Sequence, residues 1–346
     1  MQYADHRILA NAQKQFTLQK ALKNALPTLR YKLLGKPLPA SEKITICTAT
    51  IFPPLAILWY RVIKQCLGDR VDIVIFDCTG NLDPSEVPTA TVQRFLNTRH
   101  ATKIDTWLTK TTINRKLVWI CDDDVFPISE KVIGIIEREF SRPKTATVSL
   151  RPRTWWHFEI GDKEYQPSGS YCLVINRKIF AKEKLSAQPT DGNTNPTHTG
   201  KKWTRFDTLD KANEKLLKLE YRCAIVPKEE RKECTVGFNG TSIAALLLNR
   251  FHSADAMLTC LNAVTDIQWA SNVFPRCLSA LLTADAIRDL YCSTTGKPWP
   301  YPNLPTKKGL IALRKKAEPH LSSEHDFVYI DKTTDRLRTI LLPKTK

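Results

Sequence analysis

Several features that would mark other classes of protein are missing from the sequence. No run approaches the roughly 18 consecutive apolar residues of a membrane span, and the start, Met1 to Phe16, lacks the apolar core of a signal peptide. The ten cysteines form no Cys-x-x-Cys pair, so we expect free thiols in a reducing compartment rather than a zinc site or a disulfide framework. No Cys/His finger, aromatic RNA-binding signature or helix-turn-helix is present. We therefore expect a cytoplasmic protein with no specific nucleic-acid partner.

Glycine and acidic residues are also scarce. There are 12 glycines in 346 residues, and 42% of the residues are hydrophobic, so the chain can bury a sizeable core and is not intrinsically disordered. The 35 Asp and Glu residues are outnumbered by 52 Lys and Arg, which gives a formal net charge of +17. Such a surplus attracts polyanions, among them nucleic acid, anionic lipid headgroups and phosphorylated small molecules, without selecting one of them.

Residues 1–40 are expected to form a basic helical leader. Its basic residues face a single acid, Asp5, and its leucines recur at intervals compatible with one helical face, although Pro27 must break or begin a segment. Two interpretations stay open. The leader is either a surface helix on an anionic membrane, which would make the protein peripheral on the inner face of that membrane, or a helix docked on the flank of the next domain.

Residues 41–250 alternate apolar strands with helices. Near-continuous apolar strands such as "ITICTAT", "VDIVIFD" and "LVWIC", separated by helical segments, favour a mostly parallel sheet covered by helices on both faces. The fold class is therefore α/β, of the Rossmann-like nucleotide-binding type, in which ligands lie beyond the carboxyl ends of the strands. The segment "SEVPTATVQRFLNTRH", residues 85–100, is predicted to be helical. Residues 251–346 are expected to be a helical extension with a terminal hairpin around Lys332 to Asp335.

Three consecutive aspartates follow the apolar run "LVWIC". If that strand continues, Asp122 and Asp124 point the same way and Asp123 points to the opposite face, where it should tolerate replacement better. A pair of carboxylates at a strand end can hold a ribose hydroxyl or a divalent cation such as Mg²⁺ or Mn²⁺, which prefer oxygen ligands. The sequence therefore predicts a cation as the positive partner of these carboxylates.

At this stretch the chain resembles the GT-A glycosyltransferases, in the broad group around the family-two enzymes. Four features agree in order: the first strand, a second strand closing with Asp77, an apolar strand running into Asp-x-Asp ("WICDDDVF"), and an acidic residue heading a helix after a loop ("WTRFDTLDKANEKL"). The resemblance covers residues 43 to about 250. It implies a GT-A catalytic domain over 41–250, with a donor half at 41–145 and an acceptor half at 146–250.

The resemblance implies a metal-dependent transfer of a sugar from a nucleoside-diphosphate sugar to a hydroxyl of a glycan or lipid-linked acceptor, for instance in the synthesis of a cell-surface polysaccharide or lipopolysaccharide. Asp77 would contact the nucleotide base, Asp122 the ribose or the sugar, and Asp124 the Mn²⁺ or Mg²⁺ that bridges the diphosphate. Further donor-binding positions would be Thr48, Thr50, Asp123, Gly169 and Ser170, the last two in the turn "PSGSY".

On the acceptor side the resemblance implies a base that removes the proton of the attacking hydroxyl, and Asp207 is the candidate. Asp207 can equally be the N-cap of the helix that follows. His252 would be a late metal ligand, although a lone histidine near an apolar run is more often structural. Trp156 and Trp203 would stack on acceptor sugars; since adjacent tryptophans in a strand face opposite sides, one of Trp155 and Trp156 should be core.

Two other functions remain open from the sequence. A metal-dependent phosphohydrolase or nuclease would use its carboxylates to hold two ions, and it usually needs ligands at several strand ends. A non-catalytic, polyanion-binding module would use the aspartates only to cap a strand. Replacement of Asp124 separates these alternatives, because only the two enzymes need that carboxylate.

Overall fold

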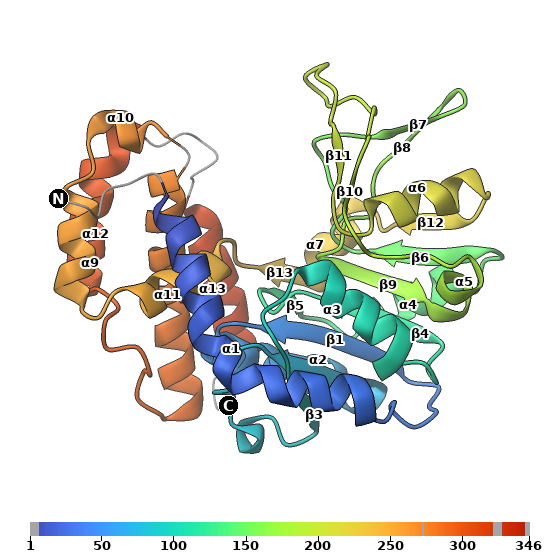
Figure 1. Cartoon of the computed structure of the whole chain (residues 1–346), viewed down its shortest axis with the longest axis horizontal. Helices are drawn as coiled ribbons and strands as arrows, with labels where there is room; N and C mark the ends of the chain where they lie inside the picture. The colour runs from blue at the N-terminus through green and yellow to red at the C-terminus, as the bar shows by residue number, and fades with distance from the viewer. Residues whose placement is uncertain (1–6, 272, 321–326, 343–346) are drawn as a thin grey trace.

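The central element of the structure is one seven-stranded sheet (Figure 1). The computed structural model describes residues 7–271, 273–320 and 327–342. The strand order is β12-β6-β9-β4-β1-β2-β3, and β9 is antiparallel to both of its neighbours while all other pairings are parallel. The strands of this sheet are β1 (Ile44–Thr50), β2 (Val71–Asp77), β3 (Ala90–Arg94), β4 (Leu117–Cys121), β6 (Thr145–Ser149), β9 (Cys172–Asn176) and β12 (Arg222–Ile225).

Helices cover both faces of this sheet, because its strands are apolar on both sides. On one face, Ile46, Ile73 and Trp119 pack in a core with α2 (Pro53–Leu67) and α4 (Lys131–Phe140). On the other face, Phe76 and Ile120 pack in a second core with α3 (His100–Thr106), α5 (Arg177–Lys182) and α6 (Asp210–Lys218). The predicted α/β fold class is confirmed: a mostly parallel sheet is flanked by helices on both faces.

Three short two-stranded pairings lie outside this sheet. They bring together β5 (Val125–Pro127) with β13 (Thr235–Gly237), β7 (Phe158–Ile160) with β8 (Lys163–Tyr165), and β10 (Thr190–Asp191) with β11 (Arg205–Phe206). The last two pairs project above the sheet beside α6 in Figure 1. The pairing of β5 with β13 joins the chain that follows the three aspartates to the chain that precedes α8.

The C-terminal part of the described chain is helical. The predicted hairpin around Lys332 to Asp335 is wrong, because these residues lie in the helix α13. Its apolar residues recur at helical spacing, and Ile330 and Leu337 enter the main core. The remaining helices are α7 (Lys228–Cys234), α8 (Thr241–Arg250), α9 (Ala254–Asn262), α10 (Asp266–Trp269), α11 (Val273–Thr295), α12 (Lys307–Ala317) and α13 (Val328–Leu341).

The helix predicted for residues 85–100 is wrong. Residues 84–86 form one turn of 3₁₀ helix, and β3 then joins the edge of the sheet parallel to β2, with Ile75 opposite Val92. The β-branched residues Thr91 and Val92 suit a strand, and the exposed edge position accounts for the polar residues between them and the next helix. Tertiary pairing therefore decided the structure of this segment.

The described part of the basic leader contains one helix, α1 (Ile8–Leu34), which continues through Pro27, so the predicted break there is wrong; residues 1–6 of the leader lie outside the described residues. Ala12 and Phe16 pack against Leu246 of α8, so the interpretation of a helix docked on the flank is confirmed for one face of α1. The helix α1 contacts both α8 and β3, and Figure 1 shows its C-terminal part beside β3 at the edge of the sheet. In the described part of the chain, no helix combines the length and apolar character needed to span a bilayer.

Candidate functional site

A polar cavity of about 450 Å³ lies at the carboxyl ends of β1 and β4. This is the edge of the sheet at which ligands bind in open α/β folds. The walls come from segments far apart in the chain: the ends of β1, β3 and β4, the start of α3, the segment before β9, the segment before α6, and the N-terminus of α8. Asp122, Asp123, Asp124 and Asp207 all line it.

The three consecutive aspartates form a turn and do not continue the strand. β4 ends at Cys121, and the backbone N–H of Val125 donates to the carbonyl oxygen of Asp122 at 3.0 Å. All three side chains line the cavity, so the prediction that Asp123 faces away is wrong. The alternation of a pleated strand does not apply to residues in a turn.

Each of the three carboxylates has its own polar neighbour. The Thr241 hydroxyl at the start of α8 donates to Oδ2 of Asp124 at 3.0 Å, and the Thr50 side chain hydrogen-bonds to Asp123. Nε2 of His100 lies 3.5 Å from Oδ1 of Asp122. Hydrogen bonds from Thr50 after β1 and from Thr241 of α8 therefore orient Asp123 and Asp124, whereas His100 of α3 only lies near Asp122.

The acidic cluster lacks sufficient positive charge among its neighbours. Burial raises the pKa of Asp123 to about 7 and that of Asp124 to about 6, with the charge of Asp124 adding to the effect on Asp123. Burial, followed by the charges of Asp124 and Asp123, raises the pKa of Asp122 well above its usual range. Burial and nearby Lys103 lower the pKa of His100 to about 3, so its ring is neutral near pH 7.

Lys103 supplies positive charge next to Asp122 and Asp123. Only 6% of its surface is exposed, it lines the cavity from α3, and its Nζ donates to the carbonyl oxygen of Thr98 at 2.9 Å. Its charge favours the ionised forms of Asp122 and Asp123. The three carboxylates outnumber the two cations beside them, Lys103 near Asp122 and Asp123 and Arg151 near Asp124, and this imbalance favours the binding of a further cation.

The donor set suits a hard divalent cation that shares its coordination sphere with a ligand. Among the residues that the structure describes, no group of three or more His, Cys, Asp and Glu side chains is arranged to hold a metal ion alone. Mg²⁺ and similar ions typically use one or two protein carboxylates and complete their sphere with phosphate oxygens and water. Asp122 and Asp124 can supply such carboxylates.

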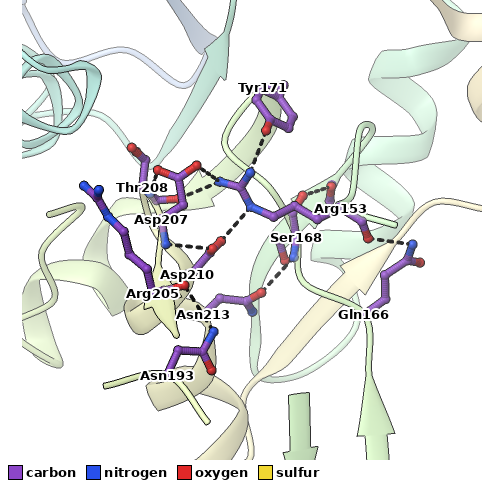
Figure 2. A network of polar contacts seen from close by, with 11 residues as sticks. Arg153, Gln166, Ser168, Tyr171, Asn193, Arg205, Asp207, Thr208, Asp210 and Asn213 are labelled. Carbon is purple, nitrogen blue, oxygen red and sulfur yellow. Dashed lines mark hydrogen bonds and ion pairs between the residues drawn. The ribbon is translucent and has the colours of Figure 1, made fainter. Parts of the chain in front are cut away.

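The buried Arg153 connects Asp207 and Tyr171, two residues that line the cavity, and Figure 2 shows the polar contacts around it. The side chain of Arg153 is fully buried, its Nε donates to Oδ1 of Asp210 at 2.9 Å, and its Nη2 lies 3.2 Å from Oδ2 of Asp207. Its Nη1 donates to the hydroxyl of Tyr171 at 2.5 Å, and its guanidinium lies over the rings of Trp155 and Tyr171. This network fixes Asp207 and Tyr171 at the cavity.

Asp207 is not the N-cap of α6. The capping position is Leu209, which has a φ of 67°, and Asp210 opens the helix. Asp210 accepts a hydrogen bond from the backbone N–H of Asp207 at 3.0 Å, while the Asp207 side chain is 50% exposed. The helix start is therefore stabilised by Asp210, and the Asp207 carboxylate remains accessible in the cavity.

The other predicted donor-binding residues lie at or behind the cavity wall. Ser170 lines the cavity. Gly169 has a φ of 67°, and a Cβ there would lie 2.7 Å from the Arg151 carbonyl oxygen, so the turn requires glycine. Thr48 and Thr50 are fully buried, and neither is among the lining residues.

Asp77 is also outside the cavity. Its side chain is buried, and both carboxylate oxygens are used by the turn that follows β2. The donors are the backbone N–H of Thr79 at 2.8 Å, the Thr79 hydroxyl at 2.6 Å, and the backbone N–H groups of Gly80 and Leu82, both at 3.0 Å. In this structure Asp77 holds a turn.

Three predicted residues on the acceptor and metal side are not brought to the cavity. Trp156 is fully buried with Phe158 and Phe206, and Trp203 packs against the same cluster. Trp156 is thus the core member of the tryptophan pair, and Trp155 is the exposed one. His252 is exposed in a bend between α8 and α9 and does not line the cavity. The expectation that neighbouring residues of a strand face opposite sides predicted one buried tryptophan, but it could not identify Trp156 as the buried one.

Sequence reasoning missed several residues that line or support the cavity: His100, Lys103, Arg153, Tyr171 and Thr241. His100 and Lys103 lie in the short helix α3 after β3; His100 is the last residue of the segment predicted as a helix over 85–100, and Lys103 lies beyond that segment. A usable signal was present in "RHATK", where two basic side chains three residues apart share one helical face.

No family model matches the chain, and no curated protein matches it. Among solved structures, it is similar to mannosyltransferase PcManGT from Pyrobaculum calidifontis in complex with GDP-Man and Mn²⁺, at 15% identity and a TM-score of 0.40, over 97% of this chain and 100% of that one. It is also similar to 4-diphosphocytidyl-2C-methyl-D-erythritol synthase from Anaerococcus prevotii DSM 20548, at 9% identity and a TM-score of 0.34, over 56% of this chain and 96% of that one.

A third similar structure is the bifunctional glycosyltransferase WbbM without ligand, at 12% identity and a TM-score of 0.27, over 43% of this chain and 34% of that one. At these identities and TM-scores, the similarities do not assign an activity to this chain.

Proposed function

We propose that the protein is a metal-dependent glycosyltransferase that moves a sugar from a nucleoside-diphosphate sugar to a hydroxyl of a glycan or glycolipid acceptor. The observation that carries this proposal is the meeting of three carboxylates and Lys103 in one cavity with Asp207 of a different segment. The cavity is large enough for a small-molecule ligand and lies at the edge of the sheet where open α/β folds bind their ligands.

The donor's diphosphate would lie near Asp124, where the N-terminus of α8 adds a partial positive charge to that of Lys103. Asp122 and Asp124 would hold Mn²⁺ or Mg²⁺, which when bound supplies Lewis-acid stabilisation of the departing diphosphate. Thr241 keeps the Asp124 carboxylate oriented through its hydrogen bond. Ser170 and Tyr171 would contact the sugar or ribose from the segment before β9.

Asp207 is the proposed base. Its carboxylate is accessible, and Oδ2 is oriented by Nη2 of Arg153 at 3.2 Å. It would accept the proton of the acceptor hydroxyl as that oxygen attacks the anomeric carbon. The acceptor class, in line with the sequence-based expectation, would be a precursor of a cell-surface polysaccharide or lipopolysaccharide.

Nucleotide binding tests this proposal. We expect the wild-type protein to be stabilised by at least one nucleoside diphosphate together with Mn²⁺, and to a smaller extent by either alone, in thermal unfolding. A ligand at one hundred times its Kd stabilises the folded state by about 2.7 kcal/mol. Asp124→Asn should lose the joint effect of metal and nucleotide, whereas Asp162→Asn, in an exposed turn remote from the cavity lining, should retain it.

The alternatives predict different results. A phosphohydrolase or nuclease would release phosphate or cut nucleic acid in the presence of the metal, and this activity would depend on Asp124. A polyanion-binding module would bind polyphosphate or nucleic acid equally well with and without Asp124. The absence of a joint shift with every nucleoside diphosphate would count against the proposed transferase.

A further inference from the structure

Helix α1 has a second apolar stripe, opposite the face that packs on the protein. The face of α1 that packs on the protein carries the buried residues Ala12, Phe16, Asn24 and Thr28. The stripe consists of Leu18 (63% exposed), Leu22 (91%), Leu26 (73%), Leu29 (54%) and Leu33 (70%). Leucines this exposed are costly to leave in water, and five on one helix are a patch rather than scattered surface residues.

The spacing of these leucines aligns them along the helix. Successive members are separated by four, four, three and four residues. At about 100° per residue, the five side chains fall within an arc of about 80°, centred opposite the side that carries Ala12, Phe16, Asn24 and Thr28. The stripe therefore points away from the protein along about four turns of α1.

The charges beside the leucine stripe are all of one sign. Within Ile8–Leu34 there is no Asp or Glu. By helical position, Lys14 and Lys32 flank one side of the stripe, and Lys23 and Arg30 flank the other. Apolar residues between two rows of long basic side chains are typical of helices that lie in the interface of an anionic bilayer, where the ammonium groups reach the headgroups.

A groove continues the stripe towards the C-terminal end of α1. It has a volume of about 430 Å³ and is lined by Leu26, Pro27, Arg30, Tyr31, Leu34, Gly35 and Gln93. Its lining is mostly apolar with a single guanidinium group, a combination suited to a lipid with an anionic headgroup.

From these observations we infer that α1 docks on an anionic lipid bilayer through its leucine stripe. The same helix contributes Gln13, on the face opposite the stripe, to the lining of the polar cavity, so docking would place that cavity about one helix diameter, ~10 Å, from the membrane surface. The consequence that a membrane-borne acceptor reaches the site rests on the proposed function, whereas the docking itself does not.

The charge of α1 favours a bilayer over a second copy of this chain as the partner of the leucine stripe. The leucine spacing would also suit a helix pair, but two copies of α1 would bring together the four basic residues that flank each stripe, with no acid on α1 to pair with them: Lys14, Lys23, Arg30 and Lys32. Anionic headgroups neutralise these charges instead.

Vesicle flotation of the full chain tests the inference. We expect binding to vesicles of phosphatidylcholine with phosphatidylglycerol, about tenfold or more weaker binding to phosphatidylcholine alone, and a decline with added salt. The triple variant Leu22→Ser/Leu26→Ser/Leu29→Ser should lose at least about tenfold in binding while keeping its thermal midpoint, because these side chains make no core contacts. Ile267→Ser, which is 85% exposed on α10, is the matched control and should bind like the wild type.

Three results would overturn the inference: no flotation of the wild type with anionic vesicles, equal flotation of the triple variant, or a dimer in light scattering that the triple variant dissociates without any vesicle binding. The charge-reversal variant Lys23→Glu/Arg30→Glu is a second test, and unchanged affinity would also contradict the inference. Asp124→Asn should still float, so a failed donor assay with intact flotation would refute the proposed activity and leave the docking standing.

Discussion

At the scale of single residues, the site depends on how buried charges are paired. Asp207 and Asp210 share one guanidinium group, and Asp210 itself is almost fully buried. Burial raises the pKa of Asp210, and the charge of Arg153 offsets part of that rise. The arginine is therefore a positioning residue, because it acts on the proposed chemistry only through Asp207 and Tyr171.

Replacement of Arg153 tests this role. We expect Arg153→Met to lower the free energy of unfolding by about 3 to 5 kcal/mol, since it leaves Asp210 buried without its partner. The measurement is urea unfolding, and Arg205→Met, an exposed arginine whose side chain makes no described contact with the aspartates, should change stability by less than about 0.5 kcal/mol. Arg153→Met/Asp210→Asn should recover part of the loss; equal stability of Arg153→Met and the wild type would contradict the pairing.

Some site residues could be predicted from the sequence, and others could not. The aspartates after β4 were predicted at the ligand edge because an apolar run followed by acids marks the end of a buried strand. Asp123 was wrongly predicted to face away from the cavity, because residues 122–125 form a turn and do not alternate as residues of a strand do. Lys103 was missed because only the folding of β3 and α3 brings it to the aspartates.

At the scale of elements, the buried strands and the amphipathic helices were the most predictable. α2 begins at Pro53 and ends at Leu67, where Gly68 adopts a φ of 58° and stops the helix, and both signals are in the sequence. β3 and α13 were mispredicted. β3 was predicted as a helix because its pairing with β2 at the edge of the sheet depends on tertiary structure. α13 was predicted as a hairpin because its Thr and Asp residues also suit a turn.

The turn after β2 gives a prediction for Asp77. Asp77→Ala removes the acceptor of four hydrogen bonds and should lower the free energy of unfolding by on the order of 3 kcal/mol. Asp83→Ala, which removes one exposed capping hydrogen bond nearby, should cost about 1 kcal/mol or less. Chemical unfolding of both variants checks the difference, and a similar cost for the two would contradict a structural role for Asp77.

At the scale of the whole molecule, the sheet and the C-terminal helices share one core. Phe274, Leu278 and Leu281 of α11 belong to the same buried cluster as Trp59 and Leu58 of α2. The expected helical extension after residue 250 is therefore continuous with the α/β unit in its packing. The net charge of +17 acts at the same scale, because it attracts polyanions of any kind toward the molecule.

The shared core predicts cooperative unfolding. Tryptophan fluorescence and far-ultraviolet circular dichroism should follow a single transition in urea, because α11 cannot leave α2 without exposing the main core. Two separate transitions would show that the C-terminal helices unfold independently.

The most direct test of the central claim is turnover of the donor. In the presence of Mn²⁺, we expect the wild-type protein to release nucleoside diphosphate from a nucleoside-diphosphate sugar. The rate of release by Asp124→Asn should be lower by about 100-fold or more, since an electrostatic contact to the leaving group is lost. Asp162→Asn should match the wild type. Release at the wild-type rate by Asp124→Asn would contradict the claim that this cavity is the site of sugar transfer.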